Sequence, residues 1–175
     1  MMKKGLKNTL AVLLCFFVAT ANFGRAECVF ATDNEYVLWK YYLVDSGKHL
    51  DWDGSTNYLR EWYAAVNVWN SYKPGVIRVD TWKTIQDVKI MDKPKYDGFT
   101  FAMTFASGKI VFYQDTMDTM TTTQRQATIM HEIGHALGIA HNINSNSIMR
   151  QGLKDFTKLH DIDKAAYDAS LARIK

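Results

Sequence analysis

The sequence predicts an α+β fold built as one domain. Two helical patterns and a C-terminal helix alternate with short β-branched and aromatic segments, in the order strand, helix, several strands, helix, loop and helix. Of the 175 residues, 47% are hydrophobic, and a chain of this length can bury its own core. No repeat, charge run or linker-like stretch follows residue 30, so residues 27–175 are expected to form a single domain.

The first 26 residues have the pattern of a secretory signal peptide. Three lysines fall within the first seven residues, and residues 10–21 form an apolar run that only Thr20 interrupts. The run is short for a membrane span, and small residues allow cleavage after Ala21 or Ala26. The sequence therefore predicts a secreted, extracellular protein without membrane attachment after cleavage. A short uncleaved anchor is the alternative.

The net charge of +3 belongs to this N-terminal segment. The chain has 21 Lys and Arg residues against 18 Asp and Glu residues, and four of the cations lie in the first 26 residues, which contain no acid. Without that segment, 17 cations face 18 anions, which gives a charge of −1. The composition therefore gives no support for nucleic acid or an anionic membrane as a partner.

The first part of the domain predicts a strand, a turn and a helix. Residues 36–44 (YVLWKYYLV) are aromatic and β-branched, which is typical of a strand. Residues 51–55 (DWDGS) are interpreted as a turn that caps the next helix. That helix is predicted over residues 56–70, because apolar residues recur there at spacings of three and four: Leu59, Trp62, Tyr63, Val66 and Trp69.

The middle of the chain predicts four further strands. Residues 76–82 alternate between the two faces of a strand, and residues 87–91 are a third strand candidate. Residues 99–105 and 109–113 flank Ser107 and Gly108, a pattern typical of a hairpin.

Two helices complete the predicted order. A threonine-rich stretch over residues 119–123 opens the first, where a capping box is possible between Thr121 and Gln124 or between Thr123 and Gln126. Gly138 is a plausible C-terminal stop for that helix. The last helix is predicted over residues 161–172.

The second helix carries the pattern HExxHxxGxxH over residues 131–141. His131 and His135 are one helical turn apart, so both rings project from one face and can bind one zinc ion. Glu132 lies beside the metal but outside its ligand set, and Gly138 allows the sharp turn that returns His141 as a third ligand. Three protein ligands leave a position open for water, as in catalytic zinc sites.

This motif resembles the signature of the metzincin metallopeptidases, which is followed by a Met-turn. Ser147, Ile148 and Met149 fit that turn, with Met149 eight residues after His141. The interval and the sequence HEIGHALGIAH look most like the matrixin branch. Arg150 follows Met149, whereas the astacin and serralysin branches have a tyrosine at that position.

The resemblance implies a fold and an activity. The fold is a twisted, mostly parallel five-stranded sheet with an active-site helix, a backing helix and a C-terminal helix. The activity is zinc-dependent endopeptidase hydrolysis of protein or peptide substrates, in which Glu132 takes a proton from zinc-bound water. The enzyme is expected to be a monomer. Met149 is expected to form an apolar floor beneath the zinc histidines.

The resemblance also implies a pocket for the side chain that follows the scissile bond. The motif helix lines it through Ala127, and residues 150–156, beginning with Arg150, bound its far side. The small side chain of Ala127 predicts a deep, apolar pocket and cleavage before Leu, Met or Phe. Lys154 is interpreted as part of a solvated face with Lys158 and Lys164.

One catalytic zinc is expected, without a second metal. Only His49 and His160 lie outside the motif, and calcium is possible but has no recognisable loop to support it. The alternative function is an exported, non-enzymatic binding protein with a structural metal site. Such a site needs a fourth protein ligand, which only Cys28 could supply from a distance, and it has no use for Glu132.

Overall fold

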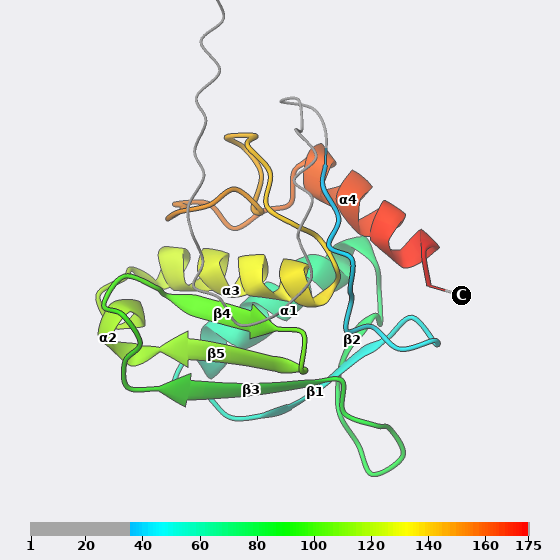
Figure 1. Ribbon diagram of the computed structural model, residues 1–175, viewed down its shortest axis with the longest axis horizontal. Helices are drawn as coiled ribbons and strands as arrows, with labels where there is room; N and C mark the ends of the chain where they lie inside the picture. The colour runs from blue at the N-terminus through cyan, green and yellow to red at the C-terminus, as the bar shows by residue number, and fades with distance from the viewer. Residues whose placement is uncertain (1–35, 175) are drawn as a thin grey trace, which may run out of the picture.

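Five strands form one sheet in the order β2-β1-β3-β5-β4 (Figure 1). The computed structural model describes residues 36–174, so the predicted signal peptide and Cys28 lie outside the described residues. The strands are β1 (Leu50–Gly54), β2 (Ile77–Val79), β3 (Val88–Lys93), β4 (Ala102–Phe105) and β5 (Lys109–Tyr113). All neighbouring pairs are parallel except the β4–β5 hairpin. The predicted α+β class with a mostly parallel five-stranded sheet is confirmed.

Two long helices pack together against the sheet. In α1 (Leu59–Tyr72), the ring of Trp62 lies 5.1 Å from that of Trp52 in β1 and 6.3 Å from that of Phe112 in β5. Trp69 of the same helix donates its indole N–H to the backbone oxygen of Met130 in α3 (Thr122–Ala136) at 3.1 Å. Helix α1 is therefore the backing helix, and it fixes the position of α3.

The remaining helices are a single turn, α2 (Gln114–Met117), and the C-terminal helix α4 (Asp161–Ala172). Figure 1 shows α4 beyond α3, away from the strands. The bounds of α4 agree with the prediction, and α3 begins with the capping box between Thr121 and Gln124.

The prediction of a turn over residues 51–55 is wrong, because residues 50–54 form β1 between β2 and β3. Asp51 makes this strand hard to predict from the sequence, because an acidic residue rarely occupies a buried strand position. Here Asp51 is 2% exposed, and both its carboxylate oxygens accept hydrogen bonds of 2.7 Å from Arg78 of the neighbouring β2. A charge paired in this way can be buried at a central strand.

The prediction of a strand over residues 36–44 is also wrong. This segment makes one isolated bridge, between Leu38 and Ile139. Its backbone instead follows the chain that leaves α3, and Trp39 N and Leu43 N each donate at 2.9 Å, to Gly138 O and Ala136 O. The aromatic and β-branched residues of this segment therefore lie along the chain that leaves α3 rather than in the sheet, and only Val44 among them is buried.

Candidate metal centre

Three histidines bring their Nε2 atoms together at the end of α3. The Nε2 of His141 lies 3.0 Å from that of His131 and 3.1 Å from that of His135. His131 and His135 come from the buried face of α3, and His141 follows the turn after the helix. The structure thus brings together the three predicted ligands.

Two glycines make this arrangement possible. Gly138 has a φ of 88°, and a Cβ there would lie 2.6 Å from Arg173 Nη2 and 2.8 Å from Ser170 Oγ. Only glycine accommodates both the left-handed backbone and the close approach. Within α3, a Cβ on Gly134 would lie 2.3 Å from the sulfur of Met149, so the absence of a side chain lets Met149 pack against the helix.

Backbone carbonyls orient two of the imidazole rings. The Nδ1 atoms of His131 and His135 each lie 2.8 Å from a carbonyl oxygen, that of Ile148 and that of Ile139. A carbonyl can only accept, so both Nδ1 atoms carry the proton and leave the Nε2 lone pairs directed at the centre. Trp39 Nε1 also lies 3.0 Å from His135 Nδ1, but donation to that atom would require the tautomer that cannot bind a metal through Nε2.

Burial keeps the three rings neutral. It lowers the pKa of His131 well below 6.5, and it lowers the pKa of His135 and that of His141 to about 4. Neutral imidazole is the form that binds a metal.

The geometry of the three nitrogens fits a zinc ion. Zinc at about 2.0–2.1 Å from each nitrogen places tetrahedral ligands roughly 3.3 Å apart, close to the separations found here. Three lone pairs directed at one point repel one another unless a cation lies between them. No fourth ligand joins the cluster among residues 36–174, so the site is of the open kind.

Glu132 lies at this centre with its carboxylate buried. Its side chain is 5% exposed, and the hydroxyl of Thr104 in β4 lies 2.7 Å from Oε2 and 2.9 Å from the backbone oxygen of Glu132. Burial raises the pKa of Glu132 to about 7, against the opposing effects of Thr104 and the positive charge of Lys154. The sequence gives no signal for Thr104, because 28 residues separate it from Glu132.

A cavity of about 210 Å³ opens beside the metal centre. Its walls are residues 99–102 at the start of β4, one face of α3, and the segment after the Met-turn. Besides residues 99–102, the lining residues are Thr128, His131, Glu132, His141, Gln151, Gly152 and Lys154.

The lining of this cavity differs from that of the predicted pocket. Ala127 does not line it, being 1% exposed within the hydrophobic core, and Thr128 of the next helical position lines it instead. Arg150 does not line it either, although Gln151 and Gly152 do. The prediction of a solvated Lys154 is wrong: it is 5% exposed and faces the cavity, so the lining is not wholly apolar as predicted.

The Met-turn is held by a buried carboxylate at the start of α4. Asp163 is fully buried and accepts hydrogen bonds from Ser147 Oγ at 2.5 Å, Ile148 N at 3.1 Å and His160 N at 2.9 Å. Ile148 in turn supplies the carbonyl that orients His131. The position of α4 is therefore linked to the metal centre. Met149 is fully buried and packs against Gly134, between the two helical histidines.

Replacing Asp163 by alanine is expected to lower the free energy of unfolding by about 3 kcal/mol, because three buried donors lose their acceptor. Asp161→Ala is the matched control, since its carboxylate is fully exposed and the change should cost much less stability. Urea denaturation of both variants measures the difference. Equal losses would show that Asp163 does not hold the Met-turn.

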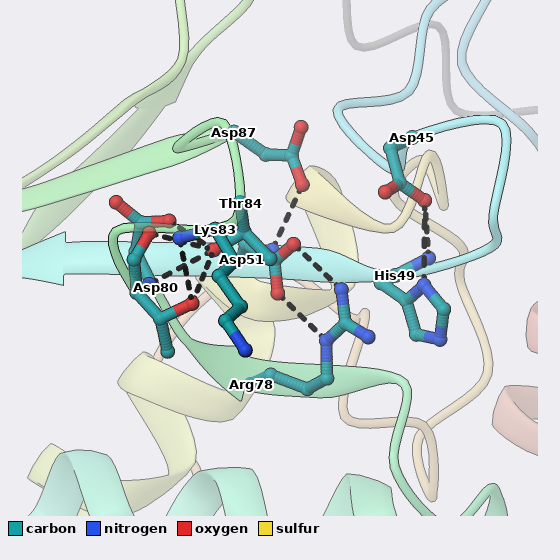
Figure 2. A network of polar contacts seen from close by, with 9 residues as sticks. Asp45, His49, Asp51, Arg78, Asp80, Lys83, Thr84 and Asp87 are labelled. Atoms are coloured by element: carbon teal, nitrogen blue, oxygen red, sulfur yellow. Dashed lines mark hydrogen bonds and ion pairs between the residues drawn. The ribbon is translucent and has the colours of Figure 1, made fainter.

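A second acidic group lies near the starts of β1 and β3, where Asp45, Asp51 and Asp87 approach one another (Figure 2). Protein donors already occupy these carboxylates. Arg78 takes both oxygens of Asp51, Asp51 N donates to Asp87 at 2.8 Å, and His49 N donates to Asp45 at 2.7 Å. We therefore assign this group a structural role in joining β1 to β2 and to the start of β3.

Comparison with known proteins identifies the family. The family model of the matrixins matches residues 40–169, and a search of curated proteins gives no significant match. Within residues 36–174, no helix has the length and apolar character to cross a membrane. The matched region holds the sheet, helices α1 to α3 and the histidine centre, and the chain belongs to the matrixin family of zinc metalloendopeptidases.

Proposed function

We propose that this protein is a secreted endopeptidase in which Glu132 is the general base and His131, His135 and His141 hold the catalytic zinc. The observation that carries the proposal is the buried carboxylate of Glu132 next to three converging, neutral Nε2 atoms. A structural zinc site would need a fourth protein ligand, and residues 36–174 provide none at this cluster. The geometry therefore gives no support to the alternative of a non-enzymatic metal protein.

The chain's own residues supply the proton transfers. When bound, zinc supplies Lewis acidity, which polarises the scissile carbonyl and acidifies water. Glu132 accepts the proton of the attacking water as the new C–O bond forms. The same carboxyl group then donates that proton to the leaving amine as the C–N bond breaks. A pKa near 7 suits a group that must accept and release a proton at neutral pH.

Digestion of a denatured protein mixture tests the activity. We expect internal cleavages, identified by mass spectrometry of the new termini, that stop when a chelator removes zinc and return when zinc is added back. Cleavage that continues undiminished without metal would contradict the proposal.

Export is tested separately on the protein recovered from culture medium. We expect an N-terminus that begins at residue 22 or residue 27, as the two signal cleavage sites predict. Retention of residues 1–21 on a membrane-bound protein would contradict secretion without bearing on hydrolysis.

Thr104 is expected to position the general base. Thr104→Val keeps the volume but removes the hydroxyl that holds Oε2, so kcat should fall about tenfold while zinc content stays unchanged. Thr104→Ser restores the donor and should recover most of the activity. Full activity in Thr104→Val together with a loss in Thr104→Ser would indicate that the threonine methyl group, rather than the hydroxyl, matters.

A further inference from the structure

The buried ammonium group of Lys154 faces the cavity beside the metal centre. Its side chain is 5% exposed, and its one hydrogen bond within residues 36–174 goes from Nζ to Gly152 O at 2.8 Å. No carboxylate of the described residues lies within ion-pair distance of this nitrogen. An ammonium group has three N–H donors, and the carboxylates of Glu132 and Asp163 stabilise its charge only from beyond ion-pair distance.

The charges around the cavity favour an anion. Lys154 and Glu132 are the ionisable lining groups apart from the two zinc histidines, which burial keeps neutral. Burial lowers the pKa of Lys154 to about 8, and most of the group is still protonated at pH 7. With a divalent cation at the histidines, the two positive groups outweigh the one carboxylate of Glu132.

The remaining walls suit a short side chain that is apolar along its stem. Phe99, Phe101 and Ala102 provide apolar surface, while Thr128 and Gln151 provide hydroxyl and amide groups. Aspartate and glutamate have an apolar stem that ends in a carboxylate, which pairs well with a partly desolvated ammonium group.

We propose that this cavity receives an acidic side chain of the substrate, from a residue adjoining the scissile bond, and that Lys154 binds its carboxylate. The inference rests on the proposed peptidase function and replaces the preference for large hydrophobic residues that the sequence predicts. Lys154 is thus a specificity-determining residue.

A library of peptides with amidated C-termini tests the preference. We expect the wild-type enzyme to cleave with Asp or Glu enriched at one position beside the scissile bond, and to prefer Glu over Gln there by at least about tenfold in kcat/KM. Lys154→Met keeps the length of the side chain without its charge and should abolish the preference while cleavage continues. Lys154→Glu should reverse it in favour of Lys or Arg.

Lys158→Met is the matched control, because the same substitution four residues further on affects an exposed lysine. It should leave the preference unchanged. A Lys154→Met variant that loses activity equally on all peptides, with a lowered melting temperature, would show a purely structural role for Lys154 and overturn the inference. Cleavage of this library without an acidic preference would also overturn it and leave the peptidase function standing.

Binding gives a readout that does not depend on hydrolysis. The zinc-loaded Glu132→Gln protein is titrated by calorimetry with two amidated peptides, Ala-Ala-Ala-Glu-Ala-Ala and the same peptide with Gln in place of Glu. The Glu peptide should bind at least about tenfold more tightly, and the additional Lys154→Met change should remove the difference. Equal binding of the two peptides would overturn this inference, whether or not the wild-type protein hydrolyses peptides. Failure of the wild-type protein to hydrolyse any peptide would instead refute the proposed function.

Discussion

Replacing Glu132 by alanine is expected to keep one zinc ion per chain and to reduce hydrolysis by at least about a hundredfold. The carboxylate is not among the converging ligand atoms, so its removal leaves the three Nε2 atoms in place. It is the group placed to accept the proton of water, and burial has already brought its pKa to about 7. Metal analysis and steady-state kinetics on one peptide measure the two quantities together.

Glu61→Ala provides the comparison for this variant. Glu61 also lies on a helix, and its side chain is mostly shielded from solvent. It pairs with Arg125 at 3.4 Å and does not line the cavity. It should cost stability without changing kcat. If Glu132→Ala retained its activity, the general base would have to be another group.

Replacing His141 by alanine is expected to lower zinc affinity by more than about a hundredfold and to abolish hydrolysis with it. His131 and His135 remain on α3, but two nitrogens cannot hold zinc as three do. Zinc content after dialysis against a weak chelator measures the loss, and activity at saturating zinc shows whether any site remains.

His49→Ala is the control for that experiment. His49 is partly exposed beside Asp45, outside the histidine cluster, and its loss should leave zinc content at one per chain. Unchanged zinc binding in His141→Ala would place the third ligand elsewhere in the chain.

The parts of the fold that the sequence predicts are those whose signals are local. The capping box at Thr121, the one-turn spacing of His131 and His135 and the bounds of α4 all depend on neighbours within a few residues. The predicted number of five strands agrees with the sheet, but residues 36–44 are not one of its strands and β1 is. Residues 36–44 look like a strand because they are aromatic and β-branched, although only Val44 among them is buried. β1 does not look like one because its Asp51 is paired with Arg78, 27 residues away.

The details of the site were less predictable for the same physical reason. Thr104 reaches Glu132 from an edge strand, and the direction of the Lys154 side chain depends on how the segment after Met149 folds over α3. A lysine in a polar stretch is usually solvated, and composition favours that interpretation. The orientation that places its charge in the cavity arises from tertiary packing.

Both ends of the described chain meet at the turn that delivers the third histidine. Arg173 donates from its guanidinium to Trp39 O at 2.5 Å and to Gly138 O at 3.2 Å, and Ala140 N donates to Val37 O at 2.9 Å. Residues 134 positions apart thus fix one turn, and closing so long a stretch of chain has an entropic cost that slows folding. During synthesis, the chain must emerge as far as Arg173 before these contacts can form. The turn that carries the third histidine is therefore secured only once α4 has been made, although that helix contributes no ligand.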